Sequence, residues 1–494
     1  MFPSVHVLHT HPRNVLITGV TGFVGQAVLE RFLREDARVH VVIRPRAGQS
    51  GRDRLDHVLA QSAFDTWRRE VGVAGVAKAR SRLHVIEGDL ARPLPEIPGD
   101  IDLVVHSAST VSFDEPIDRA LGSNVLGAKH LYDALERSGS TPHVVHVSTS
   151  YVNTDRTDVG LERAVEHDAD WRAEAARALA ARDAVEGAED ATKQLREYGR
   201  IRARALGWTD VYTMSKALGE RVAEELWAGA GQRLTVLRPT IIESALQRPA
   251  PGWIDGFKVA DPLIAAYAKD RLVAFPGRAD AVLDVVPVDV VVDAVMATAY
   301  LPPSAGRARY LQVGTGVSNP ITLDEFGQHV EAAVRSAPWK DRAGETISPR
   351  PWSFLPPEDI DAWVDRRLSA LAVIARTLEA VPMAASLRAR VAATEKRLRT
   401  MREYLAIYLP YTTSRTVYDD RNTRTLLEHA QRLGLEGVLD VTRIDWEAYL
   451  RRVHMPSLAA LAETHRMSRR PHVPTRRRPA SRGSLATPLS ASGA

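Results

Sequence analysis

The sequence predicts an α/β protein with a doubly wound parallel sheet, because short apolar segments alternate along the chain with segments of helical periodicity. Helical segments are expected at 26–34, where apolar residues recur three and four positions apart, and at 120–137. Strands separated by such helices pair in parallel, since each helix carries the chain back across the sheet. The expected strands lie at 14–18, 38–43, 83–86, 103–106, 144–147, 234–237 and 310–313.

A glycine-rich turn joins the first expected strand to the first expected helix. Its glycines, at positions 19, 22 and 25, allow a tight turn, a close approach to a pyrophosphate and close packing of helix on strand. The N-terminus of the helix then offers free N–H groups to the phosphates. The turn therefore predicts a Rossmann-type dinucleotide site. Its expected residues are Thr18, Gly19, Thr21, Gly22, Phe23, Val24 and Gly25.

The end of the second strand indicates which dinucleotide binds. Sites for NAD usually carry a carboxylate there, which holds the ribose 2′-hydroxyl. This chain has Arg44 and Arg46 instead, and a guanidinium pairs well with a 2′-phosphate. The sequence therefore favours NADPH, with Arg44 as the first candidate and Arg46 as the second. The alternative for either arginine is an exposed loop side chain without a ligand.

Further cofactor contacts are expected where later strands end. Asp89 follows the third strand and is placed to accept a hydrogen bond from the adenine amine. Ser107 and Ala108 follow the fourth strand, where small residues leave room for a ligand. Asn124 lies in the next helix, where an ordinary surface role is an equal alternative. The remaining expected contacts are Leu90, Pro239, Thr240 and Ile241.

Tyr212 and Lys216 stand four residues apart at the start of an expected helix, so their side chains share one face. An ammonium beside a phenol lowers the pKa of the phenol, which would let Tyr212 donate its proton to a carbonyl oxygen. Lys216 is also expected to hold the nicotinamide ribose. A hydroxyl at the end of the fifth strand should share the substrate oxygen; Thr149 is preferred, with Ser148 and Ser150 as alternatives. The same spacing occurs by chance on ordinary helix faces, but here it follows a cofactor-type turn.

The 494 residues exceed one ordinary core, so we expect several units. An NADP-binding reductase domain should span 12–345, with a substrate lobe at about 239–340 and an Ala/Glu/Arg-rich helical insertion at about 156–208. A separate helical domain is expected at 346–465, where apolar residues keep helical spacing. The tail at 466–494 has seven arginines and no acidic residue, which predicts disorder and, as an alternative role, contact with anionic lipid or with carrier phosphates.

Composition excludes several classes of protein. The chain has no cysteine, which excludes disulfides, thiolate metal sites and an acyl-cysteine intermediate. No metal is expected. No nucleic-acid partner is expected either, since the chain without its tail is mildly acidic. The most apolar long stretch, 281–301, contains Asp284, Asp289 and Asp293, each costly at bilayer depth. We therefore expect a cytoplasmic protein, peripheral at a membrane only through its tail, and the sequence leaves the oligomeric state open.

Together the motifs are similar to those of the fatty acyl-CoA reductases, a branch of the extended short-chain dehydrogenases related to thioester-reductase domains. The resemblance covers roughly 12–330, and its most specific part is Pro-Gly-Trp-Ile-Asp at 251–255. The C-terminal region resembles that of the family only loosely, mainly at 408–422. It implies reduction of a long-chain fatty acyl thioester, on CoA or an acyl carrier protein, through the aldehyde to a primary alcohol with two NADPH. Ser150 departs from the family pattern, which has alanine there. Other matching positions lie at 18–25, 28–30, 43–45, 48, 54–55, 106–108, 111, 113–116, 124–127, 147–149, 151–153, 212–213, 216–218 and 238–239.

Several alternatives remain on the same scaffold. A nucleotide-sugar epimerase or dehydratase would retain NAD and should carry a carboxylate where Arg44 stands. A reductase that stops at the aldehyde needs the same residues, whereas a non-catalytic NADP-sensing regulator would tend to lose the Tyr–Lys pair. An apolar groove should hold the acyl chain, with core packing as the equal alternative for each residue. Its candidates are Trp253, Ile254, Phe257, Leu263, Ile264 and Tyr267.

Overall fold

Seven parallel strands form the central sheet of the computed structural model, which describes residues 12–153, 159–257, 260–272, 274–341, 343–379 and 385–468. The strand order is β11-β7-β5-β4-β1-β2-β3, so the chain starts near the middle and winds outward in both directions. The predicted doubly wound parallel sheet is therefore confirmed. The strands are β1 (Asn14–Thr18), β2 (Arg38–Ile43), β3 (Leu83–Glu87), β4 (Leu103–His106), β5 (His143–Val147), β7 (Leu234–Pro239) and β11 (Ala308–Val313).

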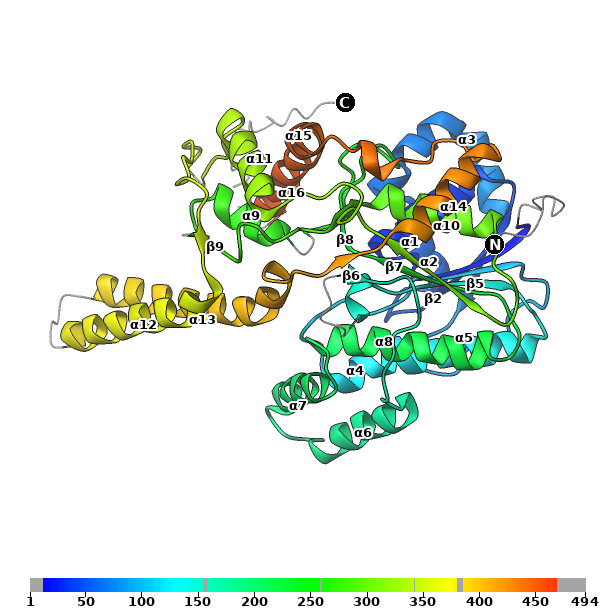
Figure 1. The fold of residues 1–494 in the computed structure, drawn as a ribbon, viewed down its shortest axis with the longest axis horizontal. Helices are drawn as coiled ribbons and strands as arrows, with labels where there is room; N and C mark the ends of the chain where they lie inside the picture. The colour runs from blue at the N-terminus through cyan, green and yellow to red at the C-terminus, as the bar shows by residue number, and fades with distance from the viewer. Residues whose placement is uncertain are drawn as a thin grey trace, which may run out of the picture.

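Helices cover both faces of this sheet (Figure 1). One face packs against α1 (Phe23–Arg34), α2 (Gly51–Leu59), α3 (Asp65–Ser81) and α10 (Val288–Tyr300). The other face packs against α4 (Ile117–Leu121), α5 (Gly127–Ser138) and α8 (Val211–Ala223). A π-helical turn at Gly122–Leu126 joins α4 to α5, so the helix predicted at 120–137 is one continuous segment with a local irregularity.

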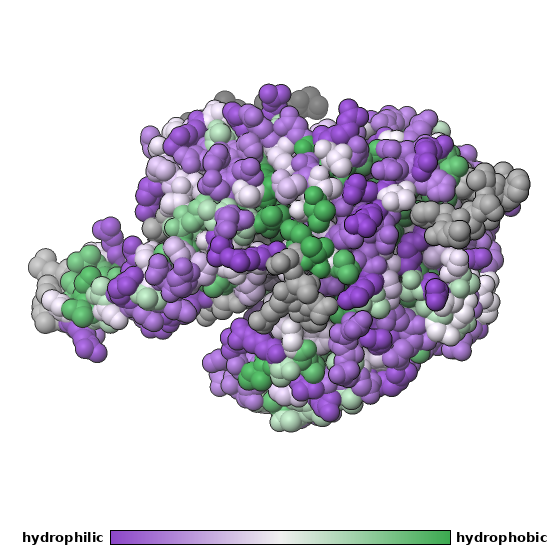
Figure 2. Space-filling model, viewed as in Figure 1, coloured by the Kyte–Doolittle hydropathy of each residue, from purple (hydrophilic) through white to green (hydrophobic). Residues whose placement is uncertain are grey.

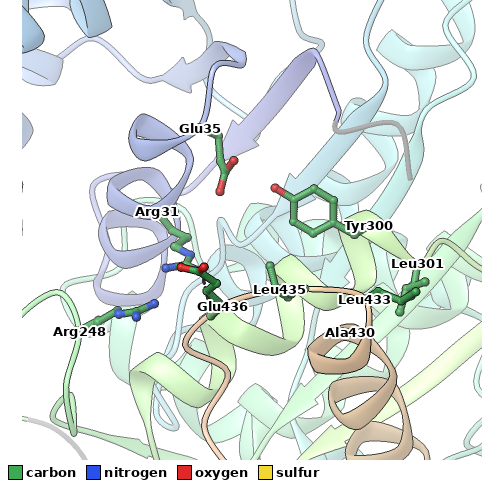
Figure 3. Close-up of a pocket in the computed structure, with 10 residues that line it drawn as sticks. Arg31, Glu35, Arg248, Tyr300, Leu301, Ala430, Leu433, Leu435 and Glu436 are labelled. Carbon is green, nitrogen blue, oxygen red and sulfur yellow. Dashed lines mark hydrogen bonds between the residues drawn. The ribbon is translucent and has the colours of Figure 1, made fainter. Parts of the chain in front are cut away.

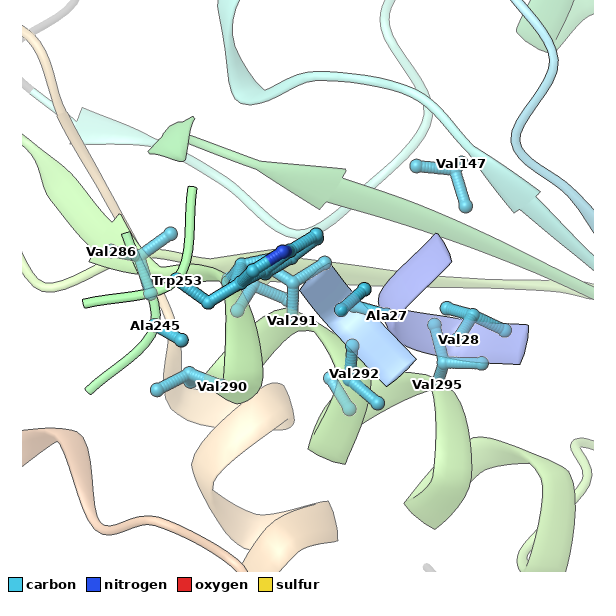
Figure 4. Close-up of a cluster of buried hydrophobic side chains, with 14 of the residues drawn as sticks. Ala27, Val28, Val147, Ala245, Trp253, Val286, Val290, Val291, Val292 and Val295 are labelled. Carbon is cyan, nitrogen blue, oxygen red and sulfur yellow. The ribbon is translucent and has the colours of Figure 1, made fainter. Parts of the chain in front are cut away.

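The long apolar stretch at 281–301 supplies the centre of the core. Residues 288–299 of α10 are all buried, and Figure 4 shows Val291, Val292 and Val295 facing α1, with Trp253 beside them. Two carboxylates of α10 are buried as well. Asp289 accepts three backbone hydrogen bonds from residues 246–248, and Asp293 accepts one from Leu439. Within the described part of the chain, no helix combines the length and the apolar character needed to cross a bilayer.

The predicted helical insertion contains α6 (Trp171–Ala184) and α7 (Ala191–Ala205), which pack beside α4 and α8. Glu174 of α6 joins the two helices, because its carboxylate accepts hydrogen bonds from Arg202 of α7 and from Arg177. The insertion therefore thickens the helical layer on this face of the sheet, as the lower part of Figure 1 shows.

The chain beyond residue 346 has two parts. First, α12 (Pro357–Glu379) and α13 (Ala385–Thr412) form a hairpin that projects from the body, with Ile360, Val364 and Leu405 buried at its base (Figure 1). The chain then returns to the body, where β13 (Val417–Tyr418) pairs with β6 (Val159–Gly160). The helices α14 (Arg421–Arg432) and α16 (Met455–Ser468) contribute to the main hydrophobic core. The tail predicted to be basic and disordered lies outside the described residues from Arg469 onward.

Buried polar side chains join this returning segment to the lobe at 239–340. In the lobe, β8 (Ile241–Glu243) pairs with β10 (Val285–Pro287), and β9 (Phe275–Pro276) pairs with β12 (Phe354–Leu355), while α9 (Asp261–Ala268) and α11 (Leu323–Ser336) pack around them. The Nε2 atom of His454 lies 3.3 Å from the Asp261 carboxylate and 3.8 Å from that of Glu243. Its Nδ1 atom lies 3.0 Å from the hydroxyl of Ser244. The C-terminal segment is thus fixed to the lobe by polar as well as apolar contacts.

A buried ion pair fixes α8 to the sheet. Arg238 of β7 donates to both carboxylate oxygens of Glu220 in α8, at 3.0 and 2.6 Å, and also to the Arg163 carbonyl. The two side chains are 0% and 2% exposed. Removing one partner of such a pair leaves an uncompensated charge in the interior, which is strongly destabilising.

We predict that Glu220→Gln lowers the free energy of unfolding by about 3 kcal/mol, measured by urea denaturation. The matched control is Glu447→Gln, which removes the exposed ion pair between Arg451 and Glu447 and should cost less than about 1 kcal/mol. Equal losses in the two variants would show that the buried pair has no special role.

Candidate active site

A cavity of about 650 Å³ opens at the carboxyl ends of the central strands, where ligands of doubly wound sheets bind. It is lined by residues from the turn after β1, the ends of β4, β5 and β7, the helix α8 and the end of α13. The structure therefore brings the predicted catalytic residues and the glycine turn into one place. The sequence-predicted residues that line it are Gly19, Gly22, Phe23, Val24, Gly25, Ser107, Thr149, Tyr212, Lys216, Pro239, Thr240 and Ile241.

A smaller cavity of about 340 Å³ lies at the other end of α1, between α10 and the loop after α14 (Figure 3). Arg31 of α1 and Glu35, which directly follows this helix, face the cavity from one side, and Tyr300 of α10 faces it from another. Arg31 donates a hydrogen bond to the carbonyl of Glu436. Its walls hold none of the predicted site residues. The C-terminal end of a helix also disfavours anions. The cavity at the carboxyl ends of the strands is therefore the candidate active site.

The glycine turn has the form that a dinucleotide pyrophosphate requires. Gly19 has φ +80°, and a Cβ atom there would lie 2.6 Å from the backbone N of Ala108. A Cβ atom at Gly25 would lie 2.1 Å from the Gly19 carbonyl oxygen, so only glycine lets α1 approach the turn this closely. The first N–H groups of α1, at Phe23, Val24 and Gly25, border the cavity with no acidic residue in that turn. These residues fit a dinucleotide.

We predict that Gly25→Ala weakens NADPH binding about tenfold or more, because α1 must move away from the turn to relieve the clash. Quenching of protein fluorescence on titration with NADPH measures this, and thermal unfolding monitors the fold. Gly122→Ala is the control, since a Cβ atom there meets nothing within 4 Å. Unchanged binding by Gly25→Ala would mean that the turn does not hold the cofactor.

Tyr212, Thr149 and Lys216 lie together on the cavity wall. Asp210 caps α8 by accepting a hydrogen bond from the backbone N of Thr213 at 2.8 Å, which places Tyr212 in the first turn. The hydroxyls of Tyr212 and Thr149 are hydrogen-bonded to each other. The buried Nζ of Lys216 donates to the Val147 carbonyl at 2.6 Å, and burial lowers the pKa of Lys216 to about 8.

The expected lowering of the Tyr212 pKa by Lys216 is wrong. Burial raises the pKa of Tyr212, and the hydrogen bond from Thr149 opposes this rise only in part. The ammonium of Lys216 is directed at the Val147 carbonyl instead of the phenol. The phenol therefore stays protonated at neutral pH.

The three hydroxyls at the end of β5 differ in direction. Ser150 is 0% exposed and donates to the Arg238 carbonyl at 2.8 Å, so it does not line the cavity. Ser148 lines the cavity, and its buried hydroxyl has no hydrogen-bond partner among the described residues. Thr149 lines the cavity and contacts Tyr212. The departure at Ser150 therefore leaves the cavity unchanged.

Three predicted cofactor residues, Thr18, Ala108 and Asn124, do not line the cavity but position the segments that do. The hydroxyl of Thr18 accepts a hydrogen bond from the backbone N of Ala108, and the hydroxyl of Ser107 donates to the Thr18 carbonyl. Asn124 is buried and bonds both the N–H and the carbonyl of Thr110, as well as the hydroxyl of Ser215 in α8. Asn124 thus holds the loop after β4 against α8, and a free surface position for it is wrong.

The other predicted cofactor residues lie beyond the cavity, at the end of β2 and β3. Arg44 is 54% exposed, and its Nη1 atom lies 3.4 Å from the Asp89 carboxylate. Arg54 of α2, which was not predicted as a site residue, donates to the Arg44 carbonyl. Burial, together with the charges of Arg46 and Arg44, lowers the pKa of Arg54, so three guanidinium groups share a positive region. Thr21 and Leu90 do not line the cavity either.

Aromatic side chains that were not predicted as site residues also line the cavity. Phe113 contacts Tyr212, Tyr408 and Tyr411 with ring centroids 5.5, 5.7 and 5.1 Å apart, and Tyr151 contacts Tyr411 at 5.0 Å. The Tyr411 hydroxyl donates to the Asp210 carboxylate at 2.5 Å. Residues 408–422 loosely matched the family's C-terminal region, which was the available signal.

The acyl groove predicted from the lobe is largely absent from this cavity. Phe257 lines the cavity, whereas Trp253, Ile264 and Tyr267 are buried in the main core. Ile254 and Leu263 pack against that core. Core packing therefore accounts for five of the six candidates. Apolar lining of the cavity comes from the aromatic group around Phe113 and from Val111, Val147, Ile241, Ile242 and Pro262.

The sequence profile of the male sterility protein family matches residues 17–295. The chain belongs to this family of fatty acyl-CoA reductases. The predicted resemblance is therefore confirmed. This fatty acyl-CoA reductase family member is 25% identical to fatty acyl-CoA reductase 1 of Arabidopsis thaliana and 26% identical to the alcohol-forming fatty acyl-CoA reductase of Simmondsia chinensis; each alignment covers 90% of this chain and 96% of the relative.

Solved structures show the same fold for this family member. The terminal R domain from the myxalamid PKS-NRPS biosynthetic pathway superposes with a TM-score of 0.57 at 19% identity, over 93% of this chain and 92% of that one. A thiolation-reductase di-domain from an archaeal non-ribosomal peptide synthetase superposes with a TM-score of 0.54 at 16% identity, over 92% and 76%. Both alignments extend beyond the Rossmann domain into the C-terminal segment.

Proposed function

We propose that this protein reduces a long-chain fatty acyl thioester with NADPH, through the aldehyde, to a primary fatty alcohol. One observation carries the proposal: Tyr212, Thr149 and Lys216 meet in a single cavity with the glycine turn. The names of the relatives support the substrate class, since they include fatty acyl-CoA reductases and one described as alcohol-forming.

When bound, the dihydronicotinamide supplies a hydride to the substrate carbon. Tyr212, protonated in the resting site, donates its proton to the substrate oxygen as negative charge develops there. The hydroxyl of Thr149 shares that oxygen, and the unpartnered hydroxyl of Ser148 lies in the same cavity. Lys216, which lines the same cavity, would hold the nicotinamide ribose. The chain has no cysteine that could form an acyl thioester with the substrate. The substrate carbonyl therefore reacts directly, and the thiol leaves from the tetrahedral adduct.

We predict that Thr149→Val lowers kcat for palmitoyl-CoA about 100-fold, because the developing oxyanion loses one donor. The matched variant Ser150→Ala should stay within about twofold of wild type, since the Ser150 hydroxyl is engaged by the Arg238 carbonyl outside the cavity. Steady-state kinetics of NADPH oxidation measure both variants. The reverse order of effects would place the catalytic hydroxyl at Ser150.

The positive region at the end of β2 supports NADPH over NADH. We predict that Arg44→Ala raises KM for NADPH about tenfold and leaves KM for NADH unchanged, because only NADPH carries a 2′-phosphate. Arg69→Ala, at an exposed arginine of α3, is the control. An equal rise in KM for NADPH and NADH would mean that Arg44 does not bind the 2′-phosphate.

One assay tests the proposed function as a whole. NADPH oxidation is followed with palmitoyl-CoA, with palmitoyl acyl carrier protein and with hexadecanal, and products are identified by mass spectrometry. The proposal expects hexadecanol from the thioester, with two NADPH consumed for each thiol released. Hexadecanal as the final product would replace it with an aldehyde-forming reductase, and no oxidation with any of the three would exclude this substrate class.

A further inference from the structure

The α12–α13 hairpin exposes hydrophobic side chains at its far end. Val373 and Ile374 of α12 are 63% and 45% exposed, and Leu387 of α13 is 44% exposed. Figures 1 and 2 show that this end lies away from the body and that hydrophobic surface gathers on it. In the described part of the chain, no other element covers these residues.

The exposed side of α12 is a regular helix face. Ala370, Val373, Ile374 and Thr377 recur at intervals of three and four residues, and all are exposed. The half-buried residues Leu368, Leu371, Ala375 and Leu378 have the same spacing, offset by one or two positions. Because α12 packs along α13, this second face is the one turned toward its partner helix. The far half of α12 therefore has two faces with apolar side chains. One face packs against α13, and the other, which is less apolar, is exposed to solvent.

Basic side chains flank the open face. Residues 366–396 contain six basic and only two acidic side chains. Arg376 lies two residues after Ile374 and Arg390 three residues after Leu387, and both are exposed. Exposed apolar residues bordered by arginines are typical of helices that lie in a membrane interface, where the guanidinium groups reach the headgroups while their neighbours are buried.

We propose that the far end of the α12–α13 hairpin docks on a lipid bilayer containing anionic headgroups, with Val373, Ile374 and Leu387 entering the interface and Arg376 and Arg390 contacting lipid phosphates. A symmetric contact with a second copy would bring the same positive charges together, which opposes it. An acidic carrier protein would form ion pairs with the arginines but would leave Val373 and Ile374 uncovered. The docking does not depend on the proposed function.

A consequence for the substrate does rest on that function. Along α13, Leu387 lies about 30 Å from Tyr408, which lines the active-site cavity. Docking would therefore hold the cavity within about 30 Å of the bilayer into which long acyl chains partition.

Flotation with lipid vesicles tests the docking on the full-length protein. We expect binding to vesicles of phosphatidylcholine mixed with phosphatidylglycerol, weaker binding to phosphatidylcholine alone, and a decrease with added salt. The double variant Val373→Asp with Ile374→Asp should lower the bound fraction about tenfold. Arg376→Glu with Arg390→Glu should reduce binding to the level seen with phosphatidylcholine alone.

The matched control is Val73→Asp with Ile201→Asp, at residues of the body that are 90% and 57% exposed, which should bind as wild type does. Binding of Val373→Asp with Ile374→Asp equal to that of this control would overturn the proposal, and so would a wild-type protein that fails to float. A wild-type dimer dissociated by the hairpin variant would instead identify a second copy as the occupant. The hairpin variants should keep their turnover of octanoyl-CoA, a soluble substrate, which separates loss of docking from failure of the proposed function.

Discussion

The hydrogen bond from the Lys216 ammonium to the Val147 carbonyl is the constraint on which the site depends. It ties α8 to β5 at the point where the strand ends. Tyr212 lies one helical turn before Lys216, and Thr149 lies two residues after Val147, so this contact sets the two hydroxyls side by side. Because the bond is buried, water cannot replace it at low cost. The same bond also directs the lysine charge away from the phenol.

This arrangement suits an acid more than a base. Burial raises the pKa of Tyr212, so the phenol keeps its proton until negative charge appears beside it. Burial lowers the pKa of the neighbouring Lys216 to about 8, close to neutral pH. The lysine side chain can donate hydrogen bonds whether or not it is charged. Reduction of a carbonyl requires a buried proton donor such as Tyr212, held here by a hydroxyl just beyond the end of β5.

The sequence was sufficient for the sheet and the glycine turn but insufficient for the far wall of the cavity. Strands such as 14–18 and 103–106 were predicted to the residue, since a buried parallel strand is a continuous apolar run bounded by turns. The contact between Asp210 and Tyr411 spans 201 residues, and helical periodicity does not say which surface an apolar face will meet. For the same reason the sequence did not reveal that α14 and α16 join the main core, while α12 and α13 leave it. The sequence preferred Thr149 but left Ser150 as an alternative, because the direction of each hydroxyl depends on a carbonyl of β7: Thr149 donates to Pro239 and Ser150 to Arg238.

The most direct measurement is the single-turnover rate of Tyr212→Phe with saturating NADPH and palmitoyl-CoA, compared with Tyr408→Phe, which removes a hydroxyl from the same cavity. We predict that Tyr212→Phe reduces the thioester about 100-fold more slowly while binding NADPH as tightly as wild type, and that Tyr408→Phe retains its rate. A Tyr212→Phe rate equal to that of wild type would contradict the assignment of the proton donor.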